Sequence, residues 1–129
     1  MTYKRIEVTR GIDELGEPEE LTWDLLPVVD SLLTAHLDEN GLPKKGTTIT
    51  PGMVLVGKIG KSRSHDPAKQ PTALEIESLD FAELSSRYAS MWQNTSCYAT
   101  SDDAGTVSDA WIEESEPTKA VVIVELHQQ

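Results

Sequence analysis

The sequence predicts a mainly β domain of the α+β class with two short helices. Two apolar, β-prone runs carry this prediction, residues 53–59 and 119–126. Both are long enough for buried strands and too short for buried helices. The chain has 129 residues and 38% of them are hydrophobic, which fits one domain, 1–129, with a core of its own.

The first half of the chain divides into three expected elements. Residues 3–9 alternate between apolar and polar side chains, which is typical of a strand. Apolar positions between 28 and 37 recur at helical spacing, and Asn40-Gly41 supplies a helix stop. A turn at Pro51-Gly52 then precedes the strand predicted for 53–59.

The second half opens with a polar loop and a helix. Residues 60–71 contain two prolines and several basic groups, so we expect a loop. Asp80 with Glu83 fits a helix start with a capping box. The apolar face of that helix would consist of Phe81, Leu84, Tyr88 and Met91, at positions i, i+3, i+7 and i+10.

Three β segments are expected after this helix. Residues 94–99 return toward β structure, and 106–112 form a strand after a turn at 102–105. A second turn at 115–117 leads to the strand at 119–126, which is the strongest strand signal in the chain. We expect this strand to pair with 53–59 or to neighbour it in one core.

The charge of the chain excludes binding by bulk electrostatics to nucleic acid or to anionic lipid. The net charge is −11, with a net of −9 on residues 71–129 alone. The clustered basic charge lies between 58 and 69. No apolar run approaches the ~20 residues of a membrane span or forms a signal peptide. We therefore expect a cytoplasmic protein without a membrane partner.

Several short motifs imitate catalytic sites without their geometry. Residues 52–58 match the opening of a phosphate-binding loop, but Ile59 stands where Ser or Thr must bind magnesium. The adjacent residues Ser64-His65-Asp66 cannot align as a hydrolase triad, because triads join distant chain positions. Cys97 is the single cysteine, and no histidines stand at ligand spacing. We expect no catalytic residues, no metal and no cofactor.

One set of motifs points to a family. The segments 37–41 (LDENG) and 46–58 (GTTITPGMVLVGK), with 15–27 upstream and 94–96 and 105–109 downstream, resemble the β subunit of bacterial RNA polymerase in motif and in order. Met53 departs from the family's usual Asp after Pro-Gly. The family's compact flap-tip helix also has no literal copy here.

The resemblance implies a flap domain of sandwich-barrel-hybrid type, excised from a larger β subunit. Residues 60–92 would form the loop and the flap-tip-like helix insertion. Such a domain would cover the RNA exit channel, and its tip would dock region four of the sigma factor and elongation factors. The resemblance implies no enzyme activity for the fragment on its own, since the catalytic aspartates of the polymerase, a nucleotidyltransferase, lie elsewhere. Its partners would include the other polymerase subunits.

Two candidate interaction sites follow. The partner-binding site would be the stripe Phe81, Leu84, Tyr88 and Met91, because helix-in-groove docking uses this spacing. The same stripe could instead pack on the β core. The basic residues Lys58, Lys61 and Arg63 would face nascent RNA in the intact enzyme, or else belong to a solvated loop.

Other classes of function remain open from the sequence. One is a carrier domain of the biotinyl or lipoyl kind, whose lysine needs a tight, exposed hairpin. Another is a different non-catalytic, β-rich binding module. A small enzyme is disfavoured because no catalytic constellation is present.

Overall fold

The largest sheet of the protein joins both ends of the chain. A computed structural model describes residues 2–116 and 119–129. Four strands form this sheet in the order β1 (Thr2–Thr9), β9 (Lys119–Gln128), β8 (Gly105–Glu116) and β3 (Thr48–Ile49). All neighbours in the sheet are antiparallel. The mainly β fold class predicted from the sequence is confirmed.

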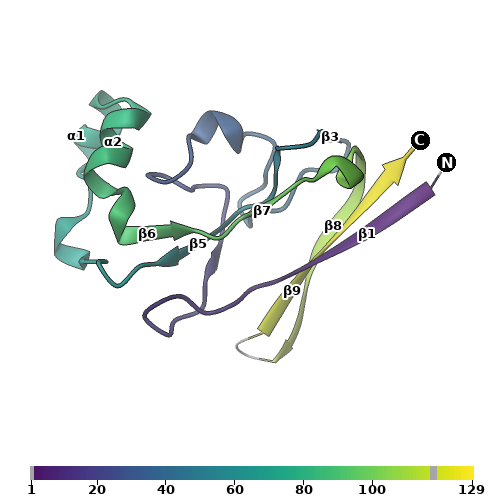
Figure 1. Ribbon diagram of the computed structural model, residues 1–129, viewed down its shortest axis with the longest axis horizontal. Coiled ribbons are helices and arrows are strands. Elements are labelled where there is room, and N and C mark those ends of the chain that lie inside the picture. Colours follow the sequence, from purple (N-terminus) through teal and green to yellow (C-terminus); the bar gives the residue numbers. More distant parts are fainter. Residues whose placement is uncertain (1, 117–118) are drawn as a thin grey trace.

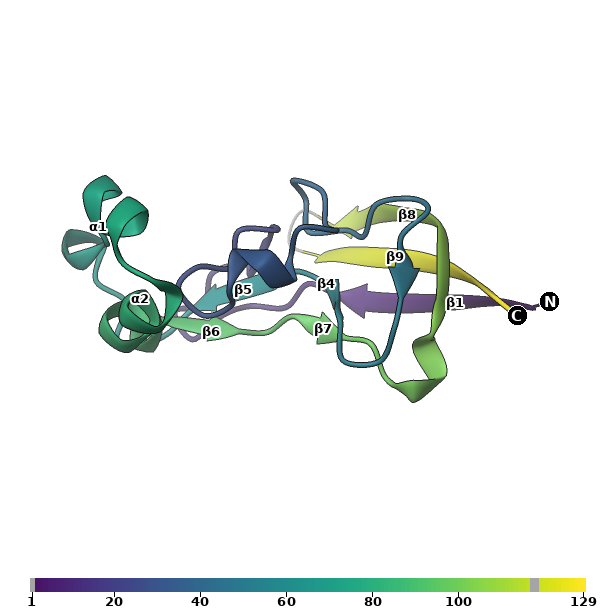
Figure 2. The same cartoon turned by 90° about the horizontal axis from the view of Figure 1, so that it is seen from above.

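Two small sheets complete the β structure. One has the order β2 (Glu20–Leu21), β5 (Lys58–Lys61), β6 (Trp92–Asn94). The other pairs β4 (Val54–Val56) with β7 (Cys97–Tyr98). Figure 2 shows β5 and β6 leading away from the large sheet toward the helices.

The helices lie at the far end of the molecule from the termini. Helix α1 (Ala73–Ser78) and helix α2 (Phe81–Tyr88) form a tip at one end of the long axis, and the N- and C-termini lie together at the other end (Figure 1). Single 3-10 turns occupy Ser31–Leu33, Pro67–Lys69, Ala89–Met91 and Ser101–Asp103.

The main core joins the large sheet to β4. Leu55 and Val56 of β4 pack in one cluster with Val122, Val124 and Leu126 of β9, all of them buried. The predicted strands 53–59 and 119–126 therefore share a core, although they do not pair with each other.

The predicted run 53–59 is divided at Gly57. The amide of Gly57 donates to the carbonyl of Gly41 at 2.8 Å, and its own carbonyl accepts from the amide of Thr22 at 3.1 Å. A Cβ at Gly57 would lie 2.2 Å from the carbonyl oxygen of Thr22. Backbone segments thus cross at a point where only glycine fits, and the strand ends on one side and restarts on the other.

The helix predicted for 28–37 is wrong. Asp30 caps a single 3-10 turn, Ser31–Leu33, and the backbone leaves helical geometry at Thr34, where φ is −119°. The Nε2 atom of His36 donates to the carbonyl of Val54 at 2.6 Å, and Leu37 is buried. These long-range contacts outweigh the local helical pattern.

Most of the remaining predicted elements are confirmed. The strands expected at 3–9, 106–112 and 119–126 are present as β1, β8 and β9, and 94–99 overlaps β6 and β7. The expected loop 60–71 begins inside β5. The turn predicted for 115–117 falls partly outside the described residues, since β8 extends to Glu116.

Candidate interaction sites at the tip and the basic segment

The tip is built from two capped helices. Thr72 and Glu75 form a reciprocal capping box at the start of α1. Asp80 starts α2 as predicted, and its side chain accepts from the amide of Glu83 at 2.8 Å. Only this half of the capping box predicted for Asp80 and Glu83 is present. The complete box lies at Thr72, a position that the sequence analysis did not select, although T-x-x-E carries the same signature.

The predicted partner-binding stripe faces largely inward. Leu84 is 3% exposed and Met91 6% exposed, whereas Phe81 and Tyr88 are half-buried. The hydroxyl of Tyr88 donates to the carboxylate of Glu75, which also pairs with Arg87 at 3.3 Å. The stripe therefore holds the tip together and offers at most Phe81 and Tyr88 to a partner.

The apolar groups that the tip exposes come from α1. Leu74 is 71% exposed and Ile76 48% exposed. Sequence reasoning missed both residues because it placed no element between the loop 60–71 and Asp80. Because they stand two positions apart in the helix, these two side chains point to different sides of α1.

Lys58 lies in the interior and does not face outward. Its ammonium is 2.9 Å from the carboxylate of Glu19 and 3.3 Å from the carbonyl of Thr9. Burial would raise the pKa of Glu19, but hydrogen bonds from Lys58 and from the amide of Gly11 lower it below its usual value. In this structure Lys58 is therefore buried and paired with Glu19.

Lys61 and Arg63 lie nearer the surface. Arg63 is exposed, and the ammonium of Lys61 pairs with Glu17 at 2.9 Å. The hydrogen bond that Lys61 donates to Glu17 is the largest cause that raises the pKa of Lys61. Of the three predicted RNA-facing residues, these two remain accessible.

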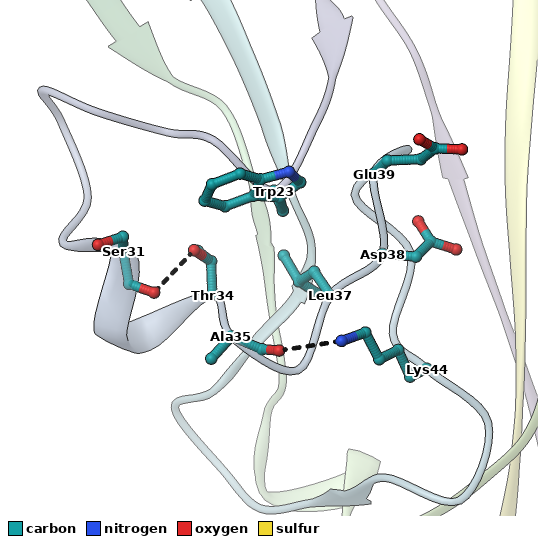
Figure 3. Close-up of a pocket in the computed structure, with 8 residues that line it drawn as sticks. All are labelled: Trp23, Ser31, Thr34, Ala35, Leu37, Asp38, Glu39 and Lys44. Carbon is teal, nitrogen blue, oxygen red and sulfur yellow. Dashed lines mark hydrogen bonds between the residues drawn. The ribbon is translucent and has the colours of Figure 1, made fainter.

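A shallow hollow lies away from both sites. Figure 3 shows Trp23 and Leu37 beside Asp38 and Glu39, with Ser31, Thr34, Ala35 and Lys44 completing the lining. The hydrogen bonds drawn there join Thr34 to Ser31 and Lys44 to the carbonyl of Ala35. Both bonds stabilise the loop itself, and the lining groups do not form a nucleophile–base pair.

The remaining sequence motifs have structural roles. His65 packs edge-on against Trp92, with ring centroids 4.6 Å apart, and Asp66 caps the turn Pro67–Lys69. Burial is the largest cause that raises the pKa of the Cys97 thiol. Across residues 2–116 and 119–129, His, Cys, Asp and Glu side chains form no group of three suited to a metal ion. No helix in the same residues is long and apolar enough to cross a membrane.

Comparison with known proteins supplies the family. Residues 1–129 match the family RNA polymerase Rpb2, domain 6. The chain is 32% identical to the DNA-directed RNA polymerase subunit beta of Bacteroides fragilis over 105 residues, which are 81% of this chain and 6% of that subunit. It is also 32% identical to the corresponding subunit of Solibacter usitatus over 124 residues, 92% of this chain and 8% of that subunit.

The chain thus spans less than a tenth of the length of these relatives. The resemblance noted in the sequence is confirmed along the whole chain, from β1 to β9. The protein belongs to the RNA polymerase Rpb2 domain 6 family.

Proposed function

We propose that this chain acts in transcription as the flap domain of an RNA polymerase β subunit and covers the RNA exit channel. The observation that carries the proposal is the family match over residues 1–129. The shape supports it: the two ends leave the molecule side by side, and the helical tip projects from the opposite end (Figure 1). Such a domain can extend from a larger subunit, whose other parts and partner subunits would hold the paired ends.

The tip is the proposed docking site for region four of the sigma factor and for elongation factors. Leu74 and Ile76 provide exposed apolar side chains on α1, and Phe81 and Tyr88 are half-buried on α2. Leu84 and Met91 of the predicted stripe support this surface from inside the tip. A helix that lays apolar side chains into a groove of its partner is a recurrent mode of recognition.

Lys61 and Arg63 are the residues proposed to face nascent RNA. Both lie at the end of β5 or just beyond it, at the base of the segment that leads to the tip. Lys58 contributes indirectly, because its buried pair with Glu19 holds β5 in place. We propose no catalytic role for the fragment on its own and a cytoplasmic location for the enzyme that contains it.

The burial of Lys58 counts against the carrier alternative. A biotinyl or lipoyl carrier presents its lysine on an exposed hairpin, whereas Lys58 is 9% exposed and paired with Glu19. The structure thus weakens the interpretation that the sequence left open for this lysine.

Binding to a purified bacterial primary sigma factor tests the docking proposal. We expect the chain to bind, and Leu74→Ala with Ile76→Ala to weaken binding by about 1–3 kcal/mol, as truncation of hot-spot residues does. Leu32→Ala is the matched control, because Leu32 is 82% exposed on a different surface. Absence of binding, or equal losses in the control and the tip variant, would refute the assignment.

A further inference from the structure

An acidic loop runs along the basic segment of this chain. The acidic loop, residues 13–19, brings a carboxylate to each of two successive lysines: Glu19 pairs with Lys58 and Glu17 with Lys61, both at 2.9 Å. These contacts join positions roughly forty residues apart in the sequence. The loop is therefore held in place by the basic segment.

Backbone contacts align the rest of the loop. The carboxylate of Asp13 accepts from the amide of Lys61 at 3.2 Å, and that of Glu14 accepts from the amide of Arg63 at 3.1 Å. Asp13 also accepts from the amides of Leu15 and Glu17, which fixes the turn of the loop. Carboxylates thus lie against the ammonium of Lys61 and against the backbone amides of Lys61 and Arg63.

The two ion pairs differ in exposure. The Glu19–Lys58 pair is buried, with side chains 7% and 11% exposed, whereas in the Glu17–Lys61 pair they are 53% and 37% exposed. An exposed ion pair contributes little to stability, so another anion can replace it at small cost. The buried contact of Glu19 therefore holds the loop in place, whereas the exposed contacts of Glu14 and Glu17 can be replaced by another anion.

We propose that the acidic loop shields Lys61 and Arg63 from RNA and must be displaced before phosphates bind there. This inference rests on the proposed function, in which these two residues face the transcript. Carboxylate and phosphate compete for the ammonium of Lys61 and for the backbone amide of Arg63, because both are oxygen anions that accept hydrogen bonds from these groups. Without RNA, the carboxylates of the loop occupy these donor groups. A polyanion that the intact enzyme holds nearby would displace the carboxylates and bind there instead.

Fluorescence anisotropy with a labelled oligouridine at low ionic strength tests the shielding. The test variant is E14Q/E17Q, which keeps hydrogen-bond acceptors but removes the two negative charges from the exposed, replaceable contacts. The matched control is E77Q/E83Q, which makes the same change in net charge on exposed positions of the tip. We expect about tenfold tighter binding for the test variant than for the control, since the Lys61 ammonium freed from Glu17 can neutralise a phosphate.

Adding Lys61→Ala to the test variant should remove the gain. Equal gains in test and control variants would overturn the proposal, because net charge alone would explain them. Absence of binding by a test variant whose circular dichroism matches the parent would also overturn it. Either failure leaves the sigma-binding test untouched, so the shielding and the docking function are judged separately.

Discussion

The hydroxyl of Tyr88 donates hydrogen bonds to the carboxylate of Glu75, 2.7 and 2.8 Å from its two oxygens. This contact joins α2 to α1, the helix that carries the exposed Leu74 and Ile76. The hydrogen bond from Tyr88 is the largest cause that lowers the pKa of Glu75, and the same bond raises the pKa of Tyr88.

Acid should release α1 from α2. Because the folded-state pKa of Glu75 lies below its usual 4.5, its contribution is fully present above pH 4.5 and is lost as the pH falls through the folded-state pKa. Tyr88→Phe should move the pKa of Glu75 back toward 4.5, measured by NMR titration of the carboxyl group. Tyr98→Phe is the control, since that hydroxyl contacts Asn94 in a different region of the chain. An unchanged Glu75 titration in Tyr88→Phe would contradict the assignment.

Lys58→Met should destabilise the whole domain. The substitution leaves the carboxylate of Glu19 buried without its cation, which costs about 3 kcal/mol in the free energy of unfolding. Urea denaturation measures this loss. The double variant K58M/E19L should recover some of it, because it removes the unpaired charge as well. A double variant no more stable than K58M would show that burial of the charge is not the cause.

Gly57→Ala should cost about 3 kcal/mol or more, because a backbone oxygen cannot move aside for the new Cβ. Gly46→Ala is the comparison: its φ of +88° is strained for alanine, but nothing lies within 4 Å of the added atom. That change should cost only about 1–2 kcal/mol. Thermal unfolding of both variants measures the difference, and equal losses would mean that steric contact at the crossing is unimportant.

Leu84→Ala should destabilise the tip by about 2–3 kcal/mol, as truncation of a buried leucine does. Leu74→Ala should leave stability nearly unchanged, because its side chain is 71% exposed. Amide exchange in α1 and α2 distinguishes the two variants. If Leu74→Ala lowered stability and Leu84→Ala left it unchanged, Leu84 would belong to the docking surface that the sequence predicted.

The sequence predicted those regions of the fold that depend on local pattern. The run Ala-Val-Val-Ile-Val in β9 and the Asp80 cap of α2 are local signals, and both elements formed where expected. The helix at 28–37 failed because the Val54 carbonyl holds His36 from a distant region of the chain. Likewise, no local pattern shows that Lys58 turns inward, since its partner Glu19 lies 39 positions away.

The candidate site was predicted less completely than the fold. Helical spacing identified the apolar face of α2, but spacing alone does not say whether a face meets a partner or the chain itself. The distinction depends on α1, because Glu75 of that helix contacts the apolar face of α2 at Tyr88. The Thr72-x-x-Glu75 capping signature of α1 is present in the sequence, but the sequence analysis predicted no helix there. Once α1 is placed, Glu75 meets Tyr88 and the exposed surface moves to Leu74 and Ile76.

The pairing of β1 with β9, from Thr2 opposite Gln128 to Thr9 opposite Val121, has a mechanical consequence. Tension applied through both ends of the chain acts at the open end of this ladder and across its hydrogen bonds. The paired residues would therefore separate in succession, as in a zipper, at low force. Pulling between an end and the tip would instead load many contacts at once. A domain held by its paired ends thus resists a pull on its tip better than a separation of its two attachments, which single-molecule pulling along the two directions would compare.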